Sequence, residues 1–271
     1  MLLPTVSIGK TPVTRMIMGG NIISGTSHLN PQLDQEMEDY YTTENVKKAL
    51  RRCEESGINT VALRTDKHIM RILREHWNEG GSLQWLAQTA SEMVSFGGNI
   101  NATMRYNPIG FYHHGSVTDH YFQHDQLDVL AERLKILRDT GLPIAMGTHN
   151  PDYIRYAEDH FDVDFYVTCV YNLTKVEHVS SAILGRSNED EVFEDEDIPL
   201  MYQAIQNTHR PCVAFKILGA SRRCGSPDQV KSSFKEAFDN IKASDLVMVG
   251  MFQRDRDEIG MNCDIVREVL A

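Results

Sequence analysis

The residues of this chain whose types and spacing could support chemistry are three histidines and one lysine, each near the end of an apolar segment. His113 and His114 follow one such segment, His149 follows a second, and Lys216 lies in a third. Histidine exchanges protons near neutral pH and binds metals. A desolvated lysine can act as a base or as a Schiff-base nucleophile. Because lysine is rarely buried without a partner, Lys216 could instead bind an anion or pair with a carboxylate.

Two further polar residues, Asp66 and His68, follow the apolar segment 58–63. Together with His114 and Lys216 they complete the set of predicted catalytic residues, which would supply acid–base or electrophilic catalysis. Side chains alternate along a strand, so only one of His113 and His114 can point inward. Cys169 is interpreted as a small core residue rather than a nucleophile.

A metal site is a further prediction for this group. Neighbouring parallel strands lie about 4.8 Å apart. His114 and His149, at the ends of consecutive strands, could therefore bind one divalent metal, with an additional ligand from Asp66, His68 or Asp119. No HxH or HExxH spacing supports this site. The competing interpretation is a set of polar residues that line a water-filled opening.

Eight short apolar segments must position these residues. Most are continuous rather than alternating, as is typical of parallel strands covered on both faces. The predicted strands are Arg15–Met18, Ile58–Leu63, Leu83–Ala87, Ile109–Tyr112, Pro143–Met146, Asp164–Cys169, Cys212–Leu218 and Leu246–Gly250.

Helix-like segments separate these strands, and we expect the helix after the third strand to be interrupted by Gly97-Gly98-Asn99. The other predicted helices are Glu44–Ser56, His124–Thr140, Pro151–His160, Ile198–Thr208, Pro227–Ile241 and Arg256–Leu270. Alternating strands and helices form right-handed βαβ units. Eight such units predict an α/β fold of the closed (β/α)8 TIM-barrel type, forming one domain over residues 1–271. The segment Val6–Val13 predicts a short N-terminal β-hairpin that plugs the barrel floor. An open doubly wound sheet is less favoured, because no GxGxxG follows the first strand.

Composition limits the partners of this domain. Its 271 residues carry 27 Lys and Arg against 38 Asp and Glu, a net charge of −11, which argues against nucleic acid as a partner. No apolar run approaches the ~18–20 residues that span a membrane. Without a secretion signal and with five scattered cysteines, the chain is expected to be cytoplasmic and to act on a small-molecule substrate. The sequence does not set the oligomeric state.

One insertion, Lys175–Asp197, is strongly acidic and contains Glu189-Asp190-Glu191 and Glu194-Asp195-Glu196-Asp197. The simpler interpretation is a solvated acidic loop. The alternative is a flap that covers the barrel mouth or attracts cations there.

The order of several segments resembles that of the aldo-keto reductases. Val6–Pro12 followed by Met18-Gly19-Gly20-Asn21 is similar to the start of that family, and Gly57–Thr60 to its second strand. Gly141–Asn150 is similar to its fifth strand and Val213–Gly219 to its seventh. The resemblance covers nearly the whole chain and implies the same barrel fold.

The resemblance also implies that the family's catalytic tetrad is degenerate here. Ala62 stands at the place of the Asp, Lys67 or His68 near that of the Tyr, and Gln88 at that of the Lys, while His114 matches the His. A Tyr or His donor protonates the alkoxide that develops in carbonyl reduction. Loss of the Tyr therefore puts ordinary hydride transfer in doubt.

Part of a dinucleotide pocket is implied by the same comparison. An NADP cofactor would contact five residues: Asn150, Thr168 and Phe215 at the nicotinamide, and Arg254 and Asn262 at the adenosine phosphate. Three functions thus remain open. The first is a divergent barrel enzyme of the lyase or isomerase type on a small polar carbonyl or sugar-like substrate. The second is an NADP-dependent oxidoreductase with an altered proton donor. The third is a non-catalytic binding protein.

Overall fold

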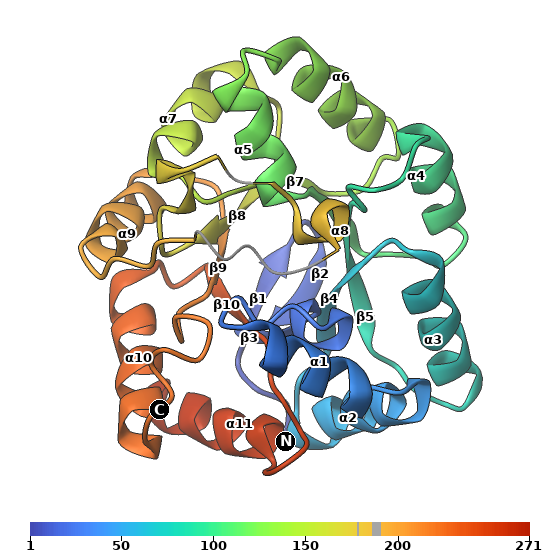
Figure 1. The fold of residues 1–271 in the computed structure, drawn as a ribbon, viewed down its shortest axis with the longest axis vertical. Coiled ribbons are helices and arrows are strands. Elements are labelled where there is room, and N and C mark those ends of the chain that lie inside the picture. The colour runs from blue at the N-terminus through green and yellow to red at the C-terminus, as the bar shows by residue number, and fades with distance from the viewer. Residues whose placement is uncertain (178, 186–190) are drawn as a thin grey trace.

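The fold is a closed barrel of eight parallel strands surrounded by helices (Figure 1). The structure is a computed structural model that describes residues 1–177, 179–185 and 191–271. The strands occur in chain order around the barrel, and the last one pairs with the first. They are β3 (Met16–Gly19), β4 (Thr60–Arg64), β5 (Gln84–Gln88), β6 (Gly110–His113), β7 (Ile144–Thr148), β8 (Phe165–Cys169), β9 (Cys212–Phe215) and β10 (Leu246–Val249). The predicted (β/α)8 barrel is confirmed.

The helices form the outer layer. They are α1 (Pro31–Tyr40), α2 (Thr43–Ser56), α3 (Lys67–Asn78), α4 (Phe96–Met104), α5 (Gly115–Gln123), α6 (Leu127–Arg138), α7 (Pro151–His160), α8 (Ser181–Leu184), α9 (Asp197–Asn207), α10 (Pro227–Asn240) and α11 (Glu258–Val269), with the short 3-10 turns η1 (Asn21–Ser24) and η2 (Leu173–Lys175). The start of α2 is typical, because the Thr42 side chain accepts a hydrogen bond from the Asn45 amide. Gly57 ends that helix at φ 94°, a conformation that glycine adopts without strain.

Three details differ from the sequence-based predictions. The helix predicted over 124–140 corresponds to α6 and begins only at Leu127, while α5 before it was not predicted; Asp125, between the two helices, adopts φ 57°. Gly97 and Gly98 do not interrupt a helix but form the first turn of α4, where the Ser95 hydroxyl accepts from the Gly98 amide. The strand predicted over 212–218 ends at Phe215, because Lys216 adopts φ 60° and leaves the extended conformation.

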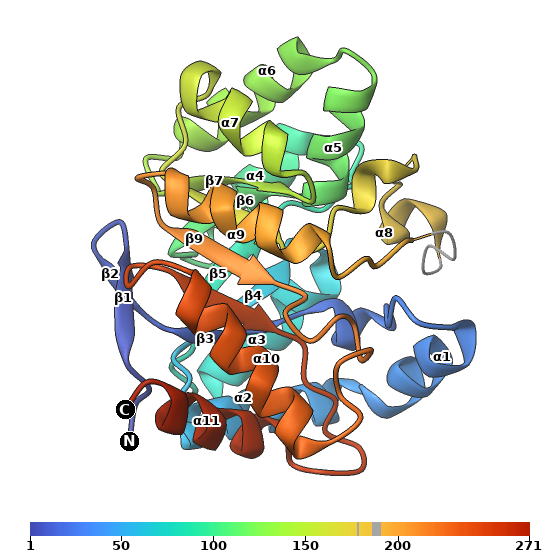
Figure 2. The same ribbon diagram turned by 90° about the vertical axis from the view of Figure 1, so that its left-hand side faces the viewer.

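The barrel floor is closed by the N-terminal hairpin, as predicted. Strands β1 (Thr5–Ile8) and β2 (Thr11–Thr14) pair antiparallel. Ile8 and Val13 of this hairpin belong to the same buried cluster as the inward-facing Ile17 and Phe165. Figure 2 shows the hairpin at the end of the barrel near both termini, and α1 and α8 at the opposite end, toward which the strand arrows point. The open mouth therefore lies at the carboxyl ends of the strands.

A second, larger apolar cluster fills the space between the barrel and its helices, and it includes Trp85, Phe111, Tyr166 and Phe234. All five cysteines are free. No helix within the described residues combines the length and apolar character needed to cross a lipid bilayer.

The packed barrel interior makes a direct stability prediction. Phe165→Ala removes a ring that is almost fully buried between the hairpin and the strands. We expect it to lower the free energy of unfolding by about 3–5 kcal/mol, measured by urea denaturation. Leu200→Ala, at an exposed position of α9, is the matched control and should change it by less than about 0.5 kcal/mol. Equal effects of the two substitutions would contradict this packing.

Candidate functional site

A cavity of about 430 Å³ opens at the carboxyl ends of the barrel strands. This volume suits a small ligand. The cavity walls come from nearly every strand end, because inward-facing positions recur every second residue and converge at the mouth. Its polar side chains include Arg64, Gln88, Tyr112, His114, His149 and Lys216.

His149 is held by the carboxylate of Asp119. The ring nitrogen Nδ1 lies 2.6 Å from Asp119 Oδ2, and the His149 amide and the Thr148 hydroxyl also donate to this carboxylate. Asp119 lies on α5 and is fully buried. An ionised carboxylate can only accept, so Nδ1 carries the proton and Nε2 carries the ring lone pair. A base oriented by a carboxylate is a recurrent catalytic arrangement.

The protonation state of His149 follows from its surroundings. Burial lowers the pKa of His149 well below its usual value of 6.5, and the nearby Lys216 ammonium lowers it further, while Glu191 acts in the opposite sense. The ring is therefore neutral at pH 7 and can accept a proton. Phe215 packs edge-on against this ring with the two centroids 5.4 Å apart, which fixes its orientation.

Lys216 forms the second part of the site. Its side chain is only 7% exposed, and its ammonium lies 3.6 Å from Glu191 Oε2. The same carboxylate oxygen lies 2.8 Å from His28 Nδ1, in the segment that precedes α1. The Asn21 amide donates to His28 Nε2, so Nδ1 is the donor to Glu191. A carboxylate is thus held between a lysine and a histidine at the mouth of the barrel.

Backbone strain is concentrated around this cluster. Six described non-glycine residues have positive φ, and four of them lie at the cavity: His28, Lys216, Ala220 and Ser221. Such conformations cost about 1–3 kcal/mol each and are found preferentially at active sites and ligand-binding loops. The loop after β9 is therefore shaped at a cost in stability, which is expected for a functional loop.

The end of the acidic insertion lies against this loop. Glu191 is buried by the mouth, and the Phe193 ring lies 3.9 Å from the Arg222 guanidinium and 5.2 Å from the Lys216 ammonium. Arg222 in turn donates to the backbone carbonyl of His28. Glu191 and Phe193 therefore pack against residues of the mouth, whereas Val192 and residues 194–196 are exposed. Glu189 and Asp190 of the same segment lie outside the described residues.

The histidine pair on β6 behaves as side-chain alternation predicts. His114 lines the cavity, whereas His113 is fully buried in the outer layer and hydrogen-bonds the Thr118 hydroxyl. Tyr112 precedes them and forms part of the cavity wall. Burial raises the pKa of Tyr112, so its phenol stays protonated and can donate a hydrogen bond.

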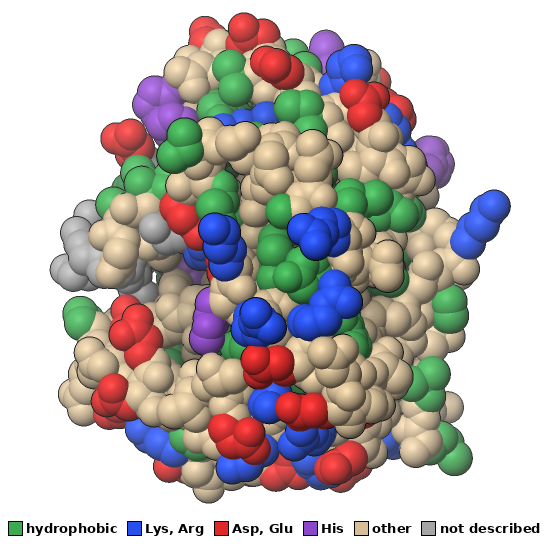
Figure 3. Space-filling view, turned by 90° about the vertical axis from the view of Figure 1, so that its right-hand side faces the viewer, with side chains coloured by type: hydrophobic (Ala, Val, Ile, Leu, Met, Phe, Trp, Pro, Cys, Tyr) green, Lys and Arg blue, Asp and Glu red, His purple; other side chains and the backbone are tan. Residues whose placement is uncertain are grey.

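The structure does not bring Asp66 and His68 into the cavity. Asp66 caps α3 by accepting from the Ile69 amide, and its carboxylate also pairs with Arg64. His68 lies exposed in the first turn of α3, next to the exposed Lys67. Figure 3 views the side of the molecule that carries α3 and shows Lys, Arg and His side chains at its surface. The catalytic set predicted from sequence is therefore divided, with His114 and Lys216 at the cavity and Asp66 and His68 outside it.

The residues expected to contact NADP do not converge either. Phe215 lines the cavity, but Asn150 caps α7 and donates to Thr174 Oγ1. Thr168 alternates with the inward-facing Val167 and so faces the helix layer. Arg254 lies on the surface, paired with Glu36 and Asp255, and Asn262 is buried on α11.

The metal site predicted at His114 and His149 acquires no third ligand among the described residues. Within the described residues, neither histidine belongs to a group of three His, Cys, Asp or Glu ligand atoms that lie close enough to share one ion. The Asp119 bond to His149 is compatible with both metal binding and proton transfer.

Sequence reasoning missed several residues of this site. Tyr112 and His28 were not identified, because neither lies in a motif, and His28 precedes α1 rather than following a strand. Glu191 was noted only as part of an acidic run. Asp119 was considered as a metal ligand, whereas in the structure its carboxylate accepts a hydrogen bond from His149. The local sequence carries no signal for these contacts, which join residues up to 163 positions apart.

Comparison with known proteins supports the fold alone. No model of a known protein family and no curated protein matches this sequence. Among solved structures, the chain is similar to a glycerol dehydrogenase from Gluconobacter oxydans, with 11% identity, a TM-score of 0.56, and coverage of 98% of this chain and 95% of that one. An aldo-keto reductase from Bacillus halodurans is 9% identical with a TM-score of 0.58, and the match covers 99% of this chain and 96% of that one. A truncated 3-deoxy-D-arabino-heptulosonate 7-phosphate synthase from Thermotoga maritima is 10% identical with a TM-score of 0.55, and the match covers 99% of this chain and 91% of that one. These barrels are a dehydrogenase, a reductase and a synthase, so the similarity selects no single reaction.

The buried histidines predict a pH dependence of stability. Burial lowers the pKa values of His113 and His149 well below 6.5. Below pH 6.5 the unfolded chain therefore binds more protons at these residues than the native chain, and stability falls as the pH falls. We expect His113→Asn, compared with the unaltered protein, to show a shallower loss of unfolding free energy between pH 6.5 and 5. His160→Ala, at an exposed position, should keep the original slope, and a His113→Asn slope identical to it would refute the prediction.

Proposed function

We propose that this protein is a barrel enzyme that performs acid–base chemistry on a small anionic carbonyl or sugar-like compound, as a lyase or an isomerase. The observation that carries the proposal is the pairing, in one cavity, of a neutral, carboxylate-oriented histidine with a buried lysine. The barrel fold is compatible with this chemistry but does not select it.

His149 is the proposed general base. Its Nε2 removes a proton from the carbon next to the substrate carbonyl, and the electron pair of the broken C–H bond moves to form an enolate. Asp119 stabilises the imidazolium that results, because its carboxylate already accepts from Nδ1. An isomerase returns the proton to a neighbouring atom. A lyase uses the same step to expel a leaving group from the next carbon.

Lys216 is the proposed binding group for a substrate anion. Its buried ammonium lies near a carboxylate of the protein itself, that of Glu191, at a distance longer than a hydrogen bond. Glu191 thereby occupies the position that a substrate carboxylate or phosphate would take between Lys216 and His28. A substrate that displaced Glu191 from this position would have to be anionic, because the buried ammonium requires a compensating negative charge.

The carbonyl oxygen requires donors on the opposite side of the reacting carbon. Tyr112, with its raised pKa, is a protonated phenol in the cavity wall, and His114 lies on the same strand end. Hydrogen bonds to the developing enolate oxygen stabilise the transition state more than the substrate. We assign this role to Tyr112 first, and His114 is the second candidate.

The NADP-dependent alternative is supported less well. Phe215 keeps an aromatic ring in the cavity, but Arg254, expected at the adenosine phosphate, is already paired with two surface carboxylates. A titration with NADPH followed by thermal shift separates the two functions, since a ligand that binds only the folded protein raises its melting temperature. A clear shift with NADPH would favour the oxidoreductase.

Proton removal can be measured without knowledge of the complete reaction. We expect the protein to catalyse exchange of hydrogen for deuterium next to the carbonyl of small 2-oxo acids and keto-sugar acids in D2O, followed by NMR. His149→Ala should slow this exchange by about 10²–10⁴-fold, the usual contribution of a general base. Asp119→Asn should slow it as well, because the ring would lose the acceptor that fixes its tautomer.

His160→Ala serves as the control for that experiment, because its ring is exposed on α7 and distant from the cavity. It should exchange at the original rate. Exchange that is equally fast in His149→Ala would refute the assignment of the base. Absence of exchange with every probe, in protein that binds none of them, would favour the non-catalytic alternative.

Glu191→Gln tests the anion site. The substitution keeps the shape of the side chain but removes its negative charge, which competes for Lys216. We expect pyruvate, used as a probe carboxylate, to bind Glu191→Gln at least about tenfold more tightly in a calorimetric titration, a gain of about 1.4 kcal/mol. Lys216→Met should remove this binding. Unchanged affinity in Glu191→Gln would show that the two carboxylates do not share a site.

A further inference from the structure

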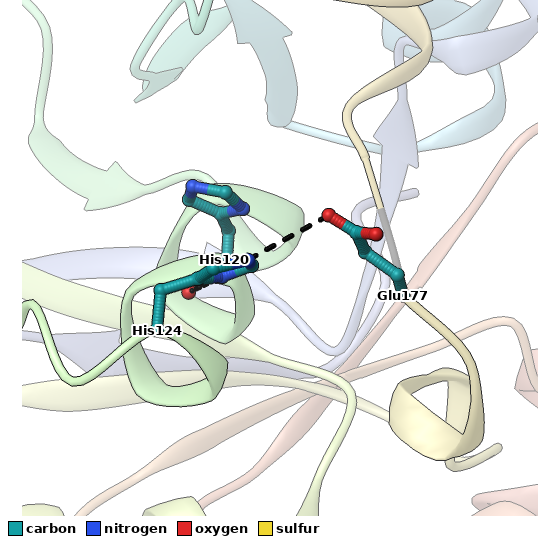
Figure 4. A group of neighbouring side chains, drawn as sticks. All are labelled: His120, His124 and Glu177. Carbon is teal, nitrogen blue, oxygen red and sulfur yellow. Dashed lines mark hydrogen bonds and ion pairs between the residues drawn. The ribbon is translucent and has the colours of Figure 1, made fainter.

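Two histidines and a glutamate outside the cavity form a compact group on the surface. His120 and His124 lie on α5, and Glu177 lies just after η2, at the start of the acidic insertion. Figure 4 shows the three side chains directed toward one another, with Glu177 facing the His124 ring. Their ligand atoms all lie within 4.8 Å of one another.

The geometry of this group is close to that of a metal centre. His120 and His124 are four residues apart and therefore project from the same face of the helix, with ring centroids 4.1 Å apart. His124 Nε2 lies 3.7 Å from Glu177 Oε1. Ligand atoms bound at about 2.0–2.1 Å in a tetrahedral zinc site are about 3.4 Å from each other. Only small side-chain movements would bring these atoms onto one ion.

The second nitrogen of His124 is arranged as in known metal sites. Its Nδ1 lies 2.8 Å from the backbone carbonyl of His120, so Nδ1 carries the proton and Nε2 carries the lone pair on the side of Glu177. A histidine that binds a metal nearly always donates its other ring N–H in this way.

We propose that His120, His124 and Glu177 bind a divalent transition-metal ion, with Zn²⁺ as the preferred ion. Two imidazoles and one carboxylate suit zinc, and the exposed position leaves the fourth coordination site to water or to a ligand from another molecule. This site is separate from the cavity and does not depend on the proposed acid–base function.

The location suggests what the metal would do. Glu177 belongs to the segment that carries Glu191 into the mouth, and the two ends of this segment are already joined by Lys175, whose ammonium lies 2.7 Å from Asp197. A metal at Glu177 would attach the beginning of the segment to α5 as well. Zinc binding would therefore stabilise the beginning of the insertion against α5.

Titration of the chelator-treated full chain with Zn²⁺ tests the proposal, with Co²⁺ absorption as a direct report of coordination. We expect one ion per chain, and a visible Co²⁺ spectrum of the four-coordinate type. The double variant His120→Ala/His124→Ala should lose both. Glu177→Gln should weaken binding at least about tenfold, since even the loss of a residue that only supports a ligand costs about 10–100-fold.

His160→Ala is the matched control, because His160 is also exposed near the end of a helix and bonds the carbonyl four residues earlier through Nδ1. It should bind zinc as the unaltered protein does. Retention of the ion in the double variant, or its loss in His149→Ala instead, would place the metal elsewhere and overturn the proposal. Deuterium exchange measured in parallel separates this outcome from any failure of the proposed acid–base function.

Discussion

Closure of the barrel is the constraint on which the rest of this molecule depends. Each of the eight strands is paired on both edges, so its side chains alternate strictly between the interior and the helix layer. At one end the hairpin residues Ile8 and Val13 fill the interior. At the other end the same inward-facing positions have no such cover, and they form the cavity in which His149 and Lys216 lie. The site is therefore a consequence of closing one end of the barrel and leaving the other open.

Electrostatics then organise the open end. Lys216 is held away from water by a strained backbone and lies beside the carboxylate of Glu191, which also accepts from His28. The positive charge of Lys216 helps to keep His149 neutral, and Asp119 fixes the orientation of its ring. The protonation of His149 therefore depends on its charged neighbours as well as on burial.

The solved structures that resemble this chain show how far a fold constrains function. A glycerol dehydrogenase, an aldo-keto reductase and a synthase share its architecture at 9–11% identity. The position that resembles the reductase Asp is Ala62, a buried residue of the barrel interior. The groups that we propose for acid–base chemistry lie at the ends of β6 and β7, on α5, and in the loops before α1 and after β9.

The sequence by itself determined the barrel, the floor hairpin and two of the cavity residues that carry the proposal. Helix caps and continuous apolar strands are local signals. The apolar strands were sufficient to place Lys216 and His149 at strand ends. Only the tertiary structure decided that Asp66 and His68 lie outside the cavity, that Asp119 contacts His149, and that Glu191 lies between Lys216 and His28. Glu191 and His28 are 163 residues apart, and nothing in either local sequence marks the contact. Such pairings depend on where loops return across the barrel mouth, because burial and charge neutralisation act between groups that meet only after the chain has folded.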